Sequence, residues 1–185
     1  MSGIITGTRH ITPGQKSHVI GKVPCGSIVQ TQVTVFTSAI NDGSPNSLDE
    51  INTGMRVTIT PTSTRNKLYM HYSASSSGGD TTAIEVYEFY DVTGSATVEP
   101  RGNDEGNRNR AHWGHRGSHA NSNDCSEICF YLYADVARTT ESVYTINRKA
   151  ADSSTDRNFN FSLSDNAAWG FTATTTFFIQ EIQTY

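Results

Sequence analysis

The chain has 185 residues, of which 35% are hydrophobic and 17% charged, and its formal net charge is −4. This length suits one domain with a substantial core, and the composition lies above the hydrophobicity at which chains stay disordered. The acidic balance argues against nucleic-acid partners, which need a concentrated basic stripe, and no run approaches the roughly 18 apolar residues of a membrane span.

Residues 1–26 are rich in glycine and proline and show no sustained alternation, so we expect no regular elements there. No basic segment precedes an apolar core, so no signal peptide is expected. The segment predicts an extended arm that docks on a larger particle, because it holds too many apolar residues for a solvated tail; a flexible tail is the alternative. The predicted docking residues are Ile4, Ile5, Ile11, Val19, Ile20 and Val23.

The first predicted strand spans 27–38. Its β-branched residues alternate with a second set, so that Val29, Thr31, Val33 and Val35 share one face and Gln30, Gln32, Thr34 and Phe36 share the other. Residues 39–47 are dense in turn formers and predict a loop. Residues 51–74 predict a strand that ends at Pro61, a polar turn and a second alternating strand, which together form a hairpin-like corner.

Further strands are predicted in the rest of the chain, separated by turn-forming segments, at 83–92, 110–116, 127–136, 142–149, 158–165 and 172–183. No segment of helical length shows a period of 3.6 residues. About nine short strands at regular spacing indicate an all-β fold, an antiparallel β-sandwich resembling a jelly roll, over residues 27–185.

Two of these strands carry aromatic residues on both faces, at Phe130, Tyr131, Tyr133, Phe177 and Phe178. One face of such a strand serves the sandwich core, and the other suits an interface. The weakly charged composition also fits a chain that hides part of its surface in an oligomer. We therefore expect a homo-oligomer, with a trimer favoured.

The most pointed cluster of polar residues is a histidine-rich segment with His112, His115 and His119. Three histidines this close are potential transition-metal ligands, but His112 and His115 fall on opposite faces of a strand. A polar edge or loop is the simpler interpretation, and we expect no cofactor. A third interpretation is a ligand or receptor surface formed by His112, Trp113 and Arg116.

No enzyme motif is found. Glycosidases need paired carboxyl groups across a cleft, whereas the acidic residues here fall in predicted loops or at strand ends: Asp49, Glu50, Asp104, Glu105, Asp124 and Glu127. Neither a nucleophile elbow nor a phosphate-binding glycine loop is present. The odd set of Cys25, Cys125 and Cys129 favours free structural thiols over a disulfide framework.

Several segments in order resemble a family of virion structural proteins, β-sandwich proteins similar to tail fibres, from marine phages and cyanophages. The residues that carry the resemblance are the opening strand, Val57-Thr58-Ile59-Thr60-Pro61, Lys67-Leu68 and the terminal Gln180-Glu181-Ile182. It covers residues 26–185, although segment 99–127 is longer and more polar than the family pattern. The resemblance implies a non-enzymatic virion protein that often forms trimers, and it implies no catalytic residues.

We therefore expect a virion surface protein, a small fibre or spike or a head decoration protein, assembled in the host cytoplasm. Its partners would be copies of itself and capsid or tail proteins of the same virion. The alternative is a carbohydrate- or receptor-binding adhesin at a fibre tip, recognising a host surface glycan. An enzyme that hydrolyses host polysaccharide is the least supported reading.

Overall fold

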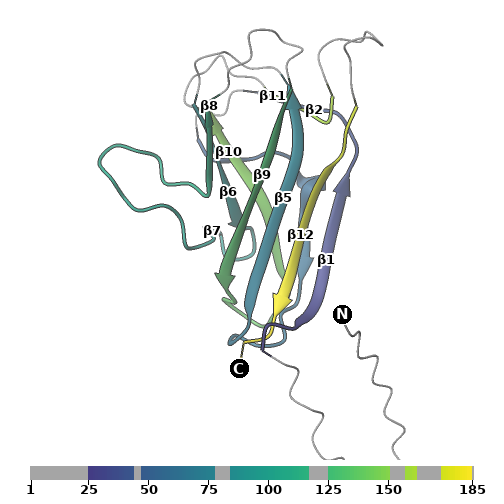
Figure 1. Ribbon diagram of the computed structural model, residues 1–185, viewed down its shortest axis with the longest axis vertical. Helices are drawn as coiled ribbons and strands as arrows, with labels where there is room; N and C mark the ends of the chain where they lie inside the picture. Colours follow the sequence, from purple (N-terminus) through teal and green to yellow (C-terminus); the bar gives the residue numbers. More distant parts are fainter. Residues whose placement is uncertain are drawn as a thin grey trace, which may run out of the picture.

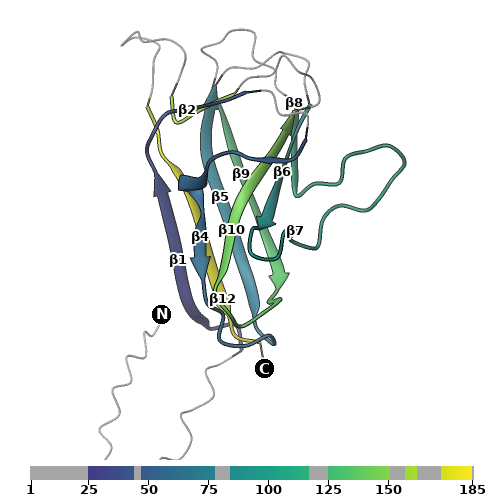
Figure 2. The ribbon, with the colours of Figure 1, turned by 180° about the vertical axis from the view of Figure 1, so that it is seen from behind.

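The computed structural model describes residues 25–43, 47–77, 84–116, 125–150, 157–161 and 172–184. These residues form two antiparallel sheets packed face to face (Figures 1 and 2), so the predicted all-β sandwich is confirmed. The jelly-roll topology stays a prediction. The predicted docking residues of the N-terminal arm lie outside the described residues.

The first sheet, sheet A, faces the viewer in Figure 1. Strand β5 (Lys67–Ser77) pairs with β9 (Cys125–Asp135) on one side and with β12 (Thr175–Ile182) on the other. Strand β1 (Ile28–Phe36) pairs with β12, so β1 and β9 lie on opposite sides of the sheet. At the far end of β5, β11 (Arg157–Phe159) pairs with β5 and with β2 (Ile40–Asp42).

The second sheet, sheet B, is centred on β10 (Ser142–Ala150) and β6 (Ile84–Asp91), which Figure 2 shows from its own side. Strands β3 (Asp49–Glu50) and β4 (Val57–Ile59) pair with β10, and a single 3-10 turn, Thr53–Met55, lies between them in the described chain. Strands β7 (Ala96–Thr97) and β8 (Trp113–Arg116) pair with β6.

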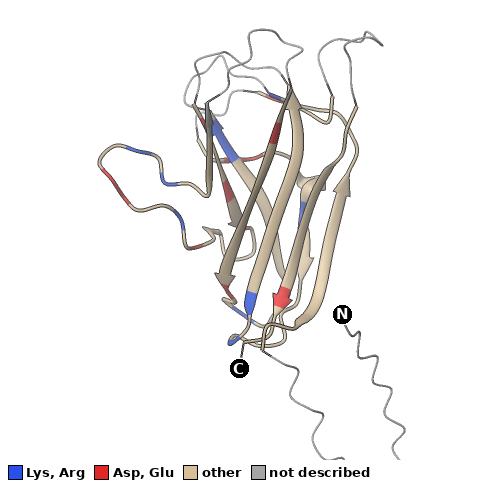
Figure 3. Ribbon diagram, viewed as in Figure 1, with Lys and Arg blue, Asp and Glu red and all other residues tan. Residues whose placement is uncertain are grey.

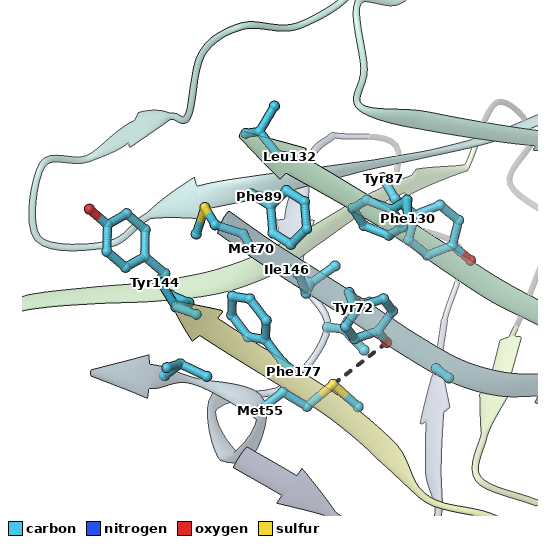
Figure 4. Close-up of a cluster of buried hydrophobic side chains, with 14 of the residues drawn as sticks. Met55, Met70, Tyr72, Tyr87, Phe89, Phe130, Leu132, Tyr144, Ile146 and Phe177 are labelled. Atoms are coloured by element: carbon cyan, nitrogen blue, oxygen red, sulfur yellow. Dashed lines mark hydrogen bonds between the residues drawn. The ribbon is translucent and has the colours of Figure 1, made fainter. Parts of the chain in front are cut away.

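The core lies between the sheets and follows from alternation along the strands. From sheet A, β5 contributes Leu68, Met70 and Tyr72, while β9 and β12 contribute Phe130 and Phe177. The inward rings of the two sheets are in contact: the ring centroids of Phe130 in sheet A and Phe89 in sheet B are 4.8 Å apart (Figure 4). The Tyr72 hydroxyl lies 3.9 Å from the Met55 sulfur, so the 3-10 turn is packed into the same core.

Two sequence expectations are corrected. Residues 39–47 were expected to form a loop, but Ile40–Asp42 form β2, which pairs with β11 and is supported by an Asn41–Asn158 side-chain hydrogen bond of 2.8 Å. The strands on either side of Pro61 do not form a hairpin: β4 belongs to sheet B and β5 to sheet A. The segment between them is a corner that joins the two sheets.

Candidate functional site: the outer face of sheet A

The histidine-rich segment is only partly described. His119 lies outside the described residues, and the side chains of His115 and Arg116, which stand in β8, are not described either. Trp113 is half-buried, with its ring 5.4 Å from Tyr87 and 6.3 Å from Phe130. Trp113 therefore packs against the core, and the ligand role predicted for His112, Trp113 and Arg116 stays a prediction.

Both ring nitrogens of His112 contact the backbone. The Phe89 N–H donates to Nδ1 at 3.1 Å, and Nε2 lies 2.9 Å from the Val98 carbonyl, which can only accept. These partners require the neutral tautomer with hydrogen on Nε2. Burial lowers the pKa of His112 to about 4, in agreement with that tautomer.

A pH dependence follows from His112. Because its pKa is about 4 when folded and about 6.5 when unfolded, its contribution is complete above pH 6.5 and is lost as pH falls toward 4. Between pH 7 and pH 5, we expect the free energy of unfolding to fall by roughly 1 kcal/mol more in the natural chain than in His112→Gln. This expected difference allows for solvent screening at the partly exposed ring. Urea denaturation at both pH values measures the difference, and parallel losses in the two proteins would contradict it.

Of the acidic residues considered for catalysis, Glu50 has structural contacts, whereas Asp104, Glu105 and Glu127 are exposed. Glu50 forms a bidentate pair with Arg56, at 2.7 and 2.6 Å, and accepts a hydrogen bond from Thr145 at 2.7 Å. The hydrogen bond and charge of Arg56 hold the pKa of Glu50 below its usual range. Among the described residues, no group of three or more His, Cys, Asp or Glu side chains has an arrangement that could hold a metal ion.

A buried ionic cluster closes one end of the sandwich. Glu85 accepts hydrogen bonds from Arg148, at 3.0 Å, and from Arg157, and the Tyr87 hydroxyl donates to its other oxygen at 2.8 Å. Arg148 also donates to Asp42 at 2.8 Å. Burial alone would raise the pKa of Glu85, but the two guanidinium charges outweigh it and hold that pKa below its ordinary value. The cluster connects β2 and β11 of sheet A to β6 and β10 of sheet B, so its role is structural.

A second buried carboxylate, Glu181, joins three segments distant in sequence. One oxygen accepts from the Thr62 N–H at 2.8 Å, the Thr62 hydroxyl at 2.7 Å and the Asn66 amide at 2.6 Å. The other accepts from Gln30 at 2.7 Å. Gln30 lies in the opening strand, Thr62 follows the Val57–Pro61 segment, and Glu181 lies in the terminal triplet. These segments, distant in sequence, thus meet at one structural junction.

The most unusual surface is the outer face of sheet A, and β1 shows it best. Its apolar residues face solvent, with Val33 57% and Val35 58% exposed. Its alternate residues point the other way: Gln30 donates to the Thr60 carbonyl at 2.7 Å and Thr34 to the Arg56 carbonyl at 2.8 Å, both next to β4. Gln30 and Thr34 thus point inward with Phe36, which packs against the core, while Val33 and Val35 point outward with Thr31, an orientation largely opposite to the usual one.

Aromatic side chains continue this outer face across the other strands. On β9, Tyr131 is 69% exposed and Tyr133 is 47% exposed. The Tyr69 ring on β5 lies 6.0 Å from Tyr131 and 5.9 Å from Phe178 on β12, and the His71 ring stacks on Phe178 at 4.9 Å. The rings form a band from β9 to β12, next to Val33, which stands opposite Phe178 in the β1–β12 register.

Charged side chains lie toward the ends of the outer face. Lys67 pairs with Asp135 at one end, and Glu127 is exposed near the other end of β9. Figure 3 shows the strands of sheet A in the neutral colour over most of their length. The central part of this surface therefore combines apolar and aromatic side chains with uncharged polar ones, such as Thr31, Ser73 and Gln180, and offers no charge for a partner to match.

Sheet B provides a contrast, because neighbouring segments of the chain cover the middle of its outer face. Glu88, on that face, is fully buried and bonded by Thr97 at 2.8 Å and Arg101 at 3.3 Å. Thr145 is bonded to Glu50, as described above, and Asn147 donates to the Leu48 carbonyl at 3.4 Å. The middle of this face is thus enclosed by the chain, although Ile84 at the start of β6 is exposed, whereas the valine and tyrosine side chains on the outer face of sheet A are open to solvent.

No protein-family model matches this chain, and neither does any curated protein. Within the described segments, no helix has the length and hydropathy needed to cross a membrane. The free thiols of Cys25 and Cys129 are exposed, and the Cys129 sulfur lies 3.4 Å from Nε2 of His71 on the outer face of sheet A.

Proposed function

We propose that this chain is a non-enzymatic structural subunit of a virion surface, which assembles with copies of itself into a trimer through the outer face of sheet A. The observation that carries the proposal is the open apolar surface on a strand whose polar side chains point inward. Contiguous apolar patches beyond a few hundred Å² are rare on monomers and mark interaction sites. Glu50, Glu85, Glu181 and His112 all have structural partners, which supports a role without catalysis for these groups.

The virion setting rests on the resemblance of the ordered segments. Their meeting at Glu181 supports a likeness of fold, because the segments specify one junction and not unrelated loops. A small fibre or spike and a head decoration protein fit equally well. In either, residues 1–26 would dock on the capsid or tail and leave the sandwich on the outside.

Sedimentation of the full chain at micromolar concentration tests the assembly. We expect a species of three chains, because separate copies would leave the outer face of sheet A in water. A chain lacking residues 1–26 should still form assemblies of three chains and keep the circular dichroism spectrum of the sandwich, but it should fail to enter virus particles. A stable monomer of the full chain would contradict the assembly, and incorporation of the shortened chain would contradict the docking arm.

A further inference from the structure

The outer face of sheet A is divided into two chemically different halves. The apolar side chains exposed or half-exposed on β1 and β12 are mainly aliphatic, namely Ile28, Val33, Val35 and Ile182, with Phe178 at the boundary and the polar Thr31, Thr176 and Gln180 beside them. On β5 and β9 the large side chains are aromatic, namely Tyr69, His71, Tyr131 and Tyr133, with Ser73, Ser75 and Cys129 beside them. We call these the aliphatic half and the aromatic half.

Strand β1, which carries most of the aliphatic half, is exposed on more than one side. Val33 and Val35 face outward, while Val29 is 38% exposed beside a register irregularity between Ile28 and Gln30, and Gln32 on the inward-pointing set is exposed too. Strand β1 pairs with β12 alone, so its other side has no strand partner among the described residues. A partner with a flat surface would contact only the outward-pointing residues of β1. A partner with a concave surface would also contact the residues along its free side and bury more of the strand.

We propose that the aliphatic half of one copy docks on the aromatic half of the next copy, in a head-to-tail contact that closes after three copies. This inference rests on the proposed function and names the contact through which the trimer forms. Each copy has one aliphatic and one aromatic half, so each contributes to two interfaces and no half is left open in a closed ring.

The chemistry of the face suits another copy as the occupant. The chain has a net charge of −4, and a contact through the uncharged centre of this face brings no like charges of two copies together. Tyrosine and valine side chains give large contact area with little loss of rotamer freedom. Each half spans two strands about 4.8 Å apart and about 30 Å long, so one contact has a flat footprint of about 300 Å² on each copy. In a closed ring each copy forms two such contacts, which together cover about 600 Å² of its sheet surface, compared with the roughly 800 Å² that each partner contributes to one standard interface.

Two variants of the full chain test the contact. Val33→Glu with Val35→Glu places charge on the aliphatic half, and Tyr131→Glu with Tyr133→Glu places charge on the aromatic half. All four positions are exposed, so circular dichroism and thermal melting should show that both variants fold. Ile84→Glu is the matched control, because Ile84 is 51% exposed on β6, outside sheet A. We expect the control to remain a trimer and each half-variant alone to sediment as a monomer.

A mixture of the two half-variants separates the alternatives. One intact aliphatic half can still meet one intact aromatic half, so an equal mixture should form dimers that do not close into trimers. If both half-variants remain trimers, this contact is overturned while the proposed assembly stands. If mixing restores no dimer, the head-to-tail pairing is overturned. A monomeric natural chain would overturn the assembly and this contact together.

Discussion

Replacing Glu85 with Gln should lower the free energy of unfolding by about 3–5 kcal/mol, the range for removing one partner of a buried ion pair. The side chains of Glu85, Arg148 and Arg157 are almost completely shielded from solvent. Gln keeps the size of the Glu85 side chain but removes the negative charge that both guanidinium groups contact. Its amide N–H group also faces hydrogen-bond donors, because Arg148, Arg157 and the Tyr87 hydroxyl all donate to this position. Urea denaturation at pH 7, at one fixed protein concentration because oligomers gain apparent stability, measures the loss.

Glu127→Gln is the matched control for Glu85→Gln. It makes the same chemical change on β9, but Glu127 is exposed on the outer face, so its effect should stay within about 0.5 kcal/mol. A cost below 1 kcal/mol for Glu85→Gln would show that the guanidinium groups do not depend on this carboxylate. That outcome would remove the cluster as the main link between the sheets at this end.

The long strands were predictable because a period of two residues is visible in sequence. The alternation of Leu68, Met70 and Tyr72 marks the inward face of β5, and all three are fully buried. Phe130 and Tyr131 likewise point to opposite faces, one buried and one exposed, as their alternation predicts. Local pattern carries this information because each strand has one face against the core.

The shortest strands and the connection between sheets were not predictable from local pattern. Strands β2, β3 and β7 have two or three residues each, too few to show a period. Strands β3 and β7 pair with the longer β10 and β6, and β2 pairs with β11, which pairs in turn with the longer β5. The β4–β5 segment has the alternation of a hairpin. Which sheet each strand joins is decided by pairing with β10 and with β9 and β12, and these partners are distant in sequence.

Alternation also leaves open which face of a strand points inward, and the candidate site depends on that choice. For β1 the valine face would be the natural inward face, yet Gln30 and Thr34 point inward because they bond to backbone carbonyls beside β4. The buried ionic cluster had a signal that was missed. On β10, every second residue points inward, first Tyr144, then Ile146 and then Arg148. On β6 the same alternation places Glu85 on the inward face with Tyr87 and Phe89. Two inward positions on neighbouring strands therefore carry opposite charges.

Glu181→Gln should lower the free energy of unfolding by about 2–3 kcal/mol, since hydrogen bonds to a charged group contribute about 1.5–3 kcal/mol. The amide N–H group of the variant also faces a hydrogen-bond donor, because both oxygens of Glu181 accept hydrogen bonds. Burial alone would raise the pKa of Glu181, but hydrogen bonds from Gln30, Asn66 and Thr62 outweigh it and lower that pKa. The stabilisation is therefore complete above the unfolded value of about 4.3 and is lost as pH falls through the folded value. Urea denaturation between pH 7 and pH 3 should show a steeper acid loss in the natural chain than in the variant. Gln180→Ala, on the outward side of β12, is the control, and an equal cost for both substitutions would mean that the junction at Glu181 does not hold the corner between the sheets.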